Sequence, residues 1–237
     1  MTKEVDNFNP GIAHRLYLIR KALYNAIQHR AGALSGKMMD FGCGEKPYKN
    51  LFAHVGEYVG VDYAGEGHDH TDEEIDFFYD GKTIPFPDNT FDSVLSTEVF
   101  EHIFNLTEIL EEIHRVMKPG AKLLFTCPFV WPLHEKPIDF ARYTPFALRH
   151  MLEKAGFRVL SMDKSGNPAE ALGVLKIDMG LNKIWYNKFT RAIYVGKALN
   201  RAFILYTNIK AVIKTKLGLY NKDGDFYLNN IVLVEKV

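Results

Sequence analysis

This 237-residue chain has few cysteines, no long apolar run and no excess of either charge. Its two cysteines, Cys43 and Cys127, are too few for a disulfide framework, which favours a reducing compartment. The longest strongly apolar stretch, residues 202–209, is far shorter than the ~20 residues that span a bilayer. Residues 1–15 lack the apolar region of a signal peptide. We therefore expect a soluble, cytoplasmic protein.

The composition also excludes disordered, collagen-like and coiled-coil chains, because 47% hydrophobic and 24% charged residues are ordinary globular values. Since 29 Lys and Arg balance 29 Asp and Glu, no net field attracts nucleic acid, and we expect no nucleic-acid partner. The net charge of zero is an average over two unlike parts of the chain, however. Residues 181–237 carry ten basic and three acidic side chains, so their net charge is +7 and that of residues 1–180 is −7.

Short apolar runs alternate with segments of helical spacing along the chain. Helices are expected at 11–31, at about 105–117 and after Thr144-Pro145, and a mostly helical insertion at about 169–219. The expected strands are 38–41, 58–62, 75–79, 93–96, 122–127, 157–162 and 227–234. This alternation predicts an α/β fold with a doubly wound, mostly parallel sheet covered by helices on both faces. We interpret residues 1–237 as one domain.

A glycine-rich turn follows the first expected strand, in Asp40-Phe41-Gly42-Cys43-Gly44, and Asp62 ends the second strand twenty residues after Gly42. Glycines let the backbone approach a ligand closely, and a carboxylate at Asp62 can accept hydrogen bonds from both ribose hydroxyls. This pair alone fits a dinucleotide, S-adenosylmethionine or an ordinary strand-turn. Pro47 stands where the dinucleotide motif has its third glycine, which disfavours a dinucleotide.

Three later segments are more specific. Residues 80–94, 98–102 and 115–123 resemble class I, type 11 S-adenosylmethionine-dependent methyltransferases, and the likeness extends over about 36–165. It implies S-adenosylmethionine as cofactor and a seven-stranded, Rossmann-like sheet whose last strand is antiparallel. The glycine turn would hold the methionine end, Asp62 the ribose and Asp80 the adenine amino group, while Tyr63 flanks the ring. The implied cofactor-binding residues are Asp40, Gly42, Cys43, Gly44, Asp62, Tyr63, Asp80 and Gly81. Lys46 departs from the family, which has a third glycine there.

A narrower resemblance covers residues 128–144, Pro-Phe-Val-Trp-Pro-Leu-His-Glu-Lys-Pro-Ile-Asp-Phe-Ala-Arg-Tyr-Thr. The segment is similar to a subset of these enzymes associated with bacterial cell-surface glycan pathways. It implies a small polar acceptor, such as a sugar or glycan hydroxyl, methylated without a metal ion. A quinone, a lipid or another small molecule is the alternative acceptor.

Five side chains are candidates for catalysis or acceptor recognition. A hydroxyl acceptor benefits from a base, and His134, after the fifth strand, is the first candidate; a structural histidine that pins the loop is the alternative. Glu98 follows the fourth strand, near the expected methionine amine. Asp139, Arg142 and Tyr143 are candidates to recognise a polar acceptor, unless Arg142 simply pairs with Asp139.

Other features have simpler interpretations. His102 is interpreted as a capping or packing residue. His68-Asp69-His70 lacks a third ligand at a suitable spacing, so no metal site is expected. Residues 181–222 carry nine Lys or Arg and no Asp or Glu; they form either a helical cover or a peripheral membrane contact. The rival functions are an NAD-dependent oxidoreductase or epimerase and a non-catalytic cofactor-binding protein. The oligomeric state is not determined by the sequence.

Overall fold

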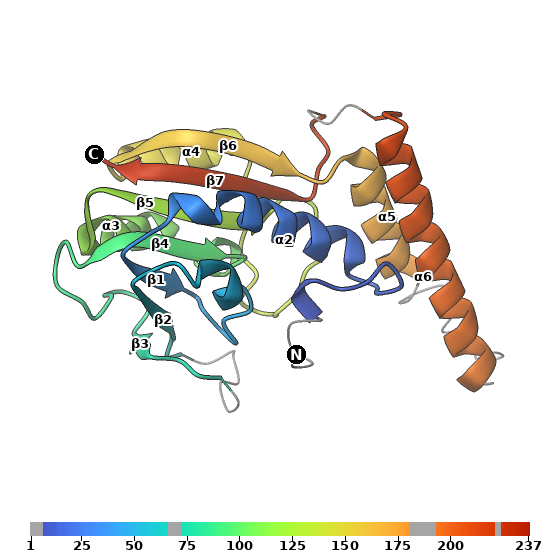
Figure 1. The fold of residues 1–237 in the computed structure, drawn as a ribbon, viewed down its shortest axis with the longest axis horizontal. Coiled ribbons are helices and arrows are strands. Elements are labelled where there is room, and N and C mark those ends of the chain that lie inside the picture. Colours follow the sequence, from blue (N-terminus) through green and yellow to red (C-terminus); the bar gives the residue numbers. More distant parts are fainter. Residues whose placement is uncertain (1–6, 66–72, 181–192, 221–223) are drawn as a thin grey trace. The chain divides into compact units, whose positions relative to one another are not determined.

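The computed structural model describes residues 7–65, 73–180, 193–220 and 224–237, with the backbone alone at 193–197. A seven-stranded sheet with the order β3-β2-β1-β4-β5-β7-β6 organises the fold (Figure 1). Strands β1 to β5 pair in parallel, and β7 runs antiparallel to β5. The expected α/β fold with an antiparallel last strand is thereby confirmed. The strands are β1 Lys37–Phe41, β2 Glu57–Tyr63, β3 Phe77–Tyr79, β4 Phe91–Thr97, β5 Met117–Pro128, β6 Phe157–Ser165 and β7 Asn229–Lys236.

Helices connect these strands, and their ends differ from the expectation by a few residues. The first described helix begins at Tyr17 rather than at residue 11. Pro119 and Gly120 lie within β5 and do not end the preceding helix, which stops at Val116. Thr144 caps α4 as expected, because its Oγ1 accepts the Ala147 amide at 3.2 Å. The α-helices are α2 Tyr17–Arg30, α3 Leu106–Val116, α4 Pro145–Lys154, α5 Pro168–Met179 and α6 Ile193–Lys216; the 3₁₀ turns are η1 Ala31–Ala33, η2 Lys49–Phe52 and η3 Phe100–His102.

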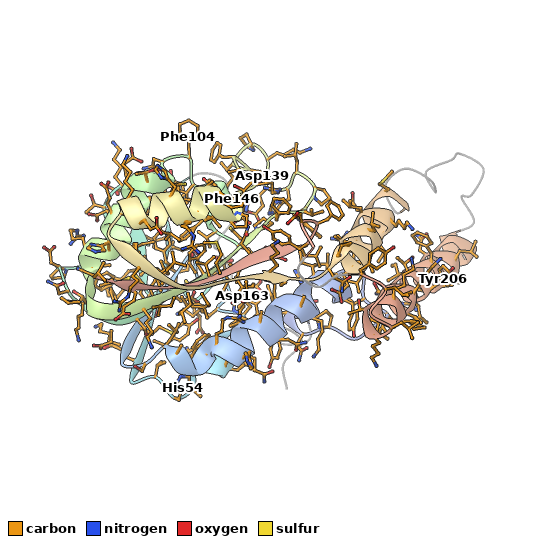
Figure 2. All side chains as sticks on the ribbon, turned by 90° about the horizontal axis from the view of Figure 1, so that it is seen from above. His54, Phe104, Asp139, Phe146, Asp163 and Tyr206 are labelled. Carbon is orange, nitrogen blue, oxygen red and sulfur yellow. The ribbon has the colours of Figure 1, made fainter. Side chains whose placement is uncertain are left out.

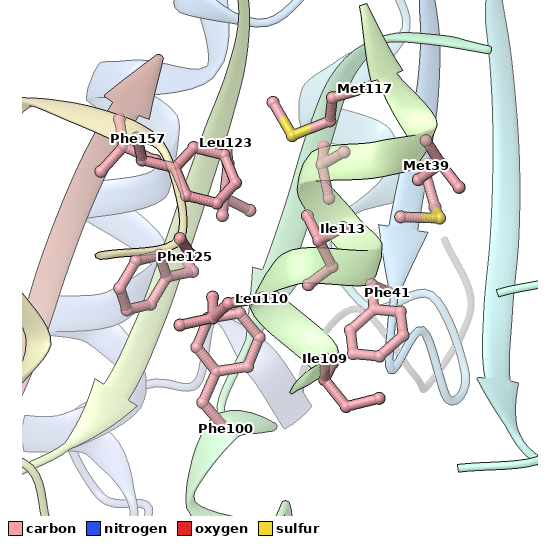
Figure 3. Close-up of a cluster of buried hydrophobic side chains, with 14 of the residues drawn as sticks. Met39, Phe41, Phe100, Ile109, Leu110, Ile113, Met117, Leu123, Phe125 and Phe157 are labelled. Carbon is pink, nitrogen blue, oxygen red and sulfur yellow. The ribbon is translucent and has the colours of Figure 1, made fainter. Parts of the chain in front are cut away.

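The main core joins the sheet to α3 and α4. The buried face of α3 carries Ile109, Leu110 and Ile113, which are at most 1% exposed and meet side chains of β1, β4 and β5 (Figure 3). Phe100 of η3 packs against Phe125 of β5 with ring centroids 4.7 Å apart. Burying each such side chain contributes roughly 1.5–3 kcal/mol. The core therefore anchors η3, the segment that follows β4, against β5.

The chain divides into two compact units: residues 26–129, 133–163 and 229–237 form one, and residues 1–25, 130–132 and 164–228 the other. All the site residues named above belong to the first of these, the sheet unit. In the second unit α5 and α6 pack together, and Asn208 of α6 donates to the Ile12 and His14 carbonyls at 2.7 and 3.0 Å. The helical insertion is confirmed where it is described. The single-domain interpretation stays a prediction.

Two sequence features lie wholly or partly outside the described residues. His68, Asp69 and His70 are outside them, as are residues 181–192 and Lys222 of the basic segment. Among the helices that the structure does describe, none is long and apolar enough to cross a membrane.

Candidate functional site

The turn after β1 has a glycine-like backbone at three alternate positions. The φ angles are +73° at Gly42, +44° at Gly44 and +52° at Lys46. A Cβ at Gly42 would lie 2.3 Å from Val99 Cγ2, so this position has no room for a side chain. Left-handed backbone is uncommon for any residue with a Cβ. Lys46 thus keeps the conformation that the missing third glycine would adopt.

The Lys46 side chain lies against β2. Its Nζ is 2.8 Å from Asp76 Oδ2, and the same carboxylate oxygen accepts the Gly60 amide at 2.6 Å. Room for the lysine depends on Gly60, because a Cβ there would lie 2.3 Å from Lys46 Cε. The departure from the three-glycine pattern therefore leaves the turn's backbone conformation unchanged.

Asp40, at the end of β1, has an unsatisfied carboxylate oxygen beside this turn. Tyr58 donates its hydroxyl to Oδ2, whereas the buried Oδ1 has no hydrogen-bond partner among the described residues. Burial raises the pKa of Asp40 to about 7. Because buried polar atoms are nearly always hydrogen-bonded, Oδ1 fits a donor supplied by a ligand, such as an amine.

The other expected cofactor residues gather at the carboxyl ends of β2 and β3. Asp62 Oδ2 accepts the Gly44 amide at 2.7 Å, which ties the glycine turn to the end of β2. Gly81 has a φ of +83°, and a Cβ there would lie 2.8 Å from the Tyr63 ring. Asp80 is exposed, and the Thr83 and Lys82 amides, which donate to its Oδ1, lower its pKa. The structure thus brings these residues together at the edge where α/β sheets bind ligands.

Cys43 lies in the glycine turn after β1. Its thiol is buried, as is that of Cys127 in β5, and burial raises the pKa of each thiol. A thiol with a raised pKa is a poor nucleophile. The cysteine in the turn is therefore suited to line a cofactor site through its backbone and packing.

Two carboxylates are buried after β4. Glu98 has a φ of +56°, and its Oε2 accepts Asn229 Nδ2 at 2.6 Å. Burial raises the pKa of Glu98 to about 7 and that of Glu101 well above its ordinary value. Neither Glu98 Oε1 nor either oxygen of Glu101 has a hydrogen-bond partner among the described residues. Sequence reasoning missed Glu101, although the spacing Glu98-x-x-Glu101-His102 was a signal for it.

The loop after β5 places His134 close to these carboxylates. Its Nε2 is 4.0 Å from Glu101 Oε1, and its Nδ1 is 3.3 Å from Asp139 Oδ2. Arg142 grips Asp139 with two hydrogen bonds of 2.5 and 2.8 Å, which hold the pKa of Asp139 well below its usual range. Figure 2 shows Asp139 in the loop that leads into α4, whose first turn carries Phe146.

His134 is suited to accept a proton. Burial, together with the neighbouring His102, lowers its pKa, so the imidazole is neutral at pH 7. Its Nδ1 lies between Asp139 and Arg142 Nη2, the latter at 3.4 Å. A proton on Nδ1 would be donated to the Asp139 carboxylate and would leave the lone pair on Nε2, whereas the Arg142 guanidinium, which only donates, fits the opposite tautomer. The Arg142–Asp139 pair expected as an alternative exists, and it fixes the loop around His134.

Tyr143 is less directly placed. Its side chain packs against the hydrophobic core, burial raises its pKa to about 12, and its carbonyl accepts Asn230 Nδ2 at 3.0 Å. A role for Tyr143 in acceptor recognition stays a prediction.

Comparison with known proteins agrees with this geometry. Residues 39–125, from β1 to β5, match the family described as "Methyltransferase domain". This part of the chain is therefore similar to a methyltransferase domain. One relative depends on S-adenosylmethionine by name, and the turn backbone, the unsatisfied Asp40 oxygen and the carboxylates Asp62 and Asp80 of this chain fit that cofactor. The NAD alternative would require a pyrophosphate site, and Pro47 stands where the dinucleotide motif has its third glycine.

Three curated relatives have names that describe different methylation reactions. A probable S-adenosylmethionine-dependent methyltransferase of Mycolicibacterium smegmatis is 27% identical over 63% of this chain and 63% of its own length. A ubiquinone/menaquinone biosynthesis C-methyltransferase of Enterobacter is 27% identical, covering 52% and 50%. A fatty-acid O-methyltransferase of M. smegmatis is 28% identical, covering 70% and 64%. The chain thus spans between half and two thirds of each relative.

A solved structure confirms the fold. A methyltransferase from Archaeoglobus fulgidus that depends on S-adenosylmethionine superimposes with a TM-score of 0.57, covering 98% of this chain and 97% of that one at 17% identity. None of these four names refers to a sugar or glycan, so the narrower resemblance of the loop after β5 stays a prediction.

Proposed function

We propose that this chain transfers the methyl group of S-adenosylmethionine to a hydroxyl oxygen of a small polar acceptor, with sugar and glycan hydroxyls as the first class to test. The observation that carries the proposal is the neutral His134 with Nδ1 3.3 Å from Asp139, in the loop that follows β5. A base of this kind serves an acceptor whose own proton leaves slowly. It has no use for an acceptor that is already an anion.

The chain's residues divide the work in this reaction. S-adenosylmethionine, when bound, supplies a methyl group on a positively charged sulfur. Asp62, Asp80 and the glycine turn bind and orient it. The acceptor oxygen forms the new bond to carbon with its lone pair, while the carbon–sulfur bond breaks and its electron pair stays on sulfur. Without a metal ion, the hydroxyl proton passes to His134 Nε2, and Asp139 stabilises the imidazolium that forms.

Positioning residues support this base. Arg142 holds Asp139 through two hydrogen bonds, and Asp139 Oδ2 also accepts the His134 backbone amide at 3.0 Å. The ring therefore keeps one orientation without reorganisation during the reaction. General-base catalysis of this type contributes typically ~10²–10⁴-fold to the rate.

The relatives supply two alternative acceptor classes. A fatty-acid carboxylate is already an anion and needs no base, and a quinone is methylated on carbon. A non-catalytic role would use the same cofactor site without turnover. The buried polar atoms of Glu98 and Glu101 favour a polar acceptor over a long alkyl chain, because an alkyl chain cannot supply the hydrogen bonds that these atoms lack within the described part of the chain.

A panel assay with radiolabelled S-adenosylmethionine tests the proposal. Sugar nucleotides, lipid-linked saccharides, quinones and fatty acids are offered separately, and the product is examined by NMR for an O-methyl or a C-methyl group. We expect label in an ether oxygen of a hydroxyl acceptor. C-methylation, ester formation on a fatty acid, or binding of S-adenosylhomocysteine with no turnover on any hydroxyl acceptor would contradict it.

We also propose that α6 contacts the surface of an anionic membrane. Four large hydrophobic side chains along this helix are at least 40% exposed, and the sequence 193–216 contains no Asp or Glu. The four are Leu199, Tyr206, Ile209 and Ile213, and the exposed Leu217 follows directly after the helix. Lys210 and Lys216 are exposed on the same helix, and Figure 2 labels Tyr206 there. An apolar stripe flanked by lysines is typical of helices that lie on anionic lipid.

A further inference from the structure

His102 presents a lone pair to carboxylates. Its Nδ1 is 2.9 Å from the Ile138 carbonyl oxygen, which only accepts hydrogen bonds, so the proton of a neutral ring is on Nδ1. Its Nε2 then faces Glu101 Oε1 at 3.7 Å and Glu135 Oε2 at 3.4 Å. Acceptor atoms that point at one another repel unless a proton or a metal ion lies among them. The His102 ring also packs edge-on against the His134 ring, with centroids 4.7 Å apart, in agreement with the packing role expected from the sequence.

The carboxyl group of Glu101 lies beside His102. The residue is completely buried, and neither of its side-chain oxygens has a hydrogen-bond partner among the described residues. An unpaired buried carboxylate is rare because its desolvation is expensive. Its Oε1 lies within 4.0 Å of both His102 Nε2 and His134 Nε2.

We propose that Glu101, His102 and His134 bind a divalent transition-metal ion. The donor atoms of the three lie within 4.8 Å of one another. Two ligands of one ion, each at about 2.1 Å, are at most ~4.2 Å apart, so Glu101 Oε1 already satisfies this limit with each histidine. Two imidazoles and one carboxylate favour Zn²⁺, Fe²⁺, Mn²⁺ or Co²⁺ over Ca²⁺.

The surroundings of the Glu101–His102–His134 cluster resemble an outer shell of metal ligands. Histidines that bind metals usually donate their second nitrogen to a carbonyl or carboxylate. Here His102 Nδ1 faces the Ile138 carbonyl and His134 Nδ1 faces Asp139. Glu135, 3.4 Å from His102 Nε2, and Glu98, whose Oε1 is unsatisfied, are further oxygen donors nearby. Open coordination positions would remain for an acceptor.

This proposal rests on one part of the proposed function, methyl transfer to a hydroxyl acceptor, and gives a different account of how that acceptor loses its proton. A hydroxyl that coordinates a metal ion has a lowered pKa, so its proton can pass to solvent while His134 Nε2 serves as a ligand. The proposal replaces the metal-free reaction that the sequence led us to expect. It predicts that acceptors with two adjacent oxygens, which can chelate the ion, are preferred.

Metal titration of the full-length, chelator-treated protein tests the site without any acceptor. Calorimetry with Zn²⁺ and the visible absorption of bound Co²⁺ are the two measurements. We expect one ion per chain, and at least tenfold weaker binding in Glu101→Gln and in His102→Asn. His150→Asn is the matched control, since His150 is an exposed histidine on α4, and it should leave the titration unchanged.

Two further measurements keep the outcome clear. Circular dichroism and S-adenosylhomocysteine binding, expected to be unchanged, show that each variant is folded; if Glu101→Gln is not, His102→Asn and His134→Asn decide. The proposal is overturned if wild-type protein binds no ion, or if binding is equal in the variants. An NMR spectrum with protons on both nitrogens of His102 at pH 7 would identify a proton as the cation instead. Methylation that continues in the presence of chelator would sink the metal site and leave the methyltransferase function standing.

Discussion

The ammonium group of Lys46 lies 2.8 Å from the Asp76 carboxylate, although Lys46 occupies a turn position with a φ of +52°. The Lys46 side chain packs against Gly60, and the Gly60 amide donates to the same Asp76 carboxylate oxygen. Three residues from separate segments thus replace the glycine that similar turns have. The energetic consequence is a mutual dependence between Lys46 and Gly60.

Substituting Gly60→Ala should reveal this dependence. The new Cβ would lie 2.3 Å from Lys46 Cε, and overpacking of this kind costs about 1–3 kcal/mol of unfolding free energy. Urea denaturation measures the loss. Gly32→Ala is the control, because a Cβ at Gly32 meets nothing within 4 Å. In the double variant with Lys46→Gly, the cost of Gly60→Ala should fall but not vanish, because the new Cβ would still lie 2.8 Å from Cys43 Sγ; full additivity would refute the coupling.

Removing the Asp62 carboxylate should weaken cofactor binding. A hydrogen bond to a charged group contributes about 1.5–3 kcal/mol, so Asp62→Ala should lower the affinity for S-adenosylhomocysteine by at least tenfold in calorimetry. Glu57→Ala, at the exposed opposite end of β2, should leave it unchanged. Wild-type protein should not bind NAD. Binding of NAD without S-adenosylhomocysteine would contradict the cofactor assignment.

Asp40 should make stability depend on pH in a predictable direction. Burial raises its pKa from 3.8 to about 7 in the folded protein, so the folded state holds a proton that the unfolded state has lost between these values. Stability from this group is therefore fully present below pH 4 and is lost as the pH rises through about 7. Relative to Asp40→Asn, wild type should lose unfolding free energy between pH 4.5 and 8; a constant difference would contradict the raised pKa.

Sequence patterns predicted the strands well, and they placed the proposed cofactor residues at one edge of the sheet, because both depend on local features. The apolar run of β1, the glycines after it and Asp62 at the end of β2 are each visible within a few residues. Glu101 was missed because its importance comes from tertiary packing: η3 turns it toward His134, which belongs to a loop more than thirty residues later. The direction of the Lys46 side chain depends on Gly60 and Asp76, in another strand and its approach, and no local rule predicts it.

His134 should be required for turnover but not for cofactor binding. The residue accepts the proton or binds the ion, and in either role His134→Ala should lower kcat by ~10²-fold or more on the true acceptor. S-adenosylhomocysteine affinity should change little. If His134 is the base, its lowered pKa places the acidic limb of the wild-type rate below pH 6.5. A wild-type rate in His134→Ala would show that the histidine is structural.

The α6 surface should bind anionic vesicles reversibly. Each Lys near an anionic leaflet contributes roughly 1 kcal/mol, and the exposed Ile213 and Leu217 add apolar contact. The protein should therefore sediment with phosphatidylserine-containing liposomes at low salt, not with neutral ones, and high salt should release it. The double substitution Lys210→Glu with Ile213→Ser should abolish sedimentation. The control substitution Lys154→Glu, at an exposed lysine of α4, should not. If wild-type protein stays in the supernatant and the double variant instead converts a dimer to a monomer in analytical ultracentrifugation, the stripe on α6 binds a second copy of the chain and not a membrane.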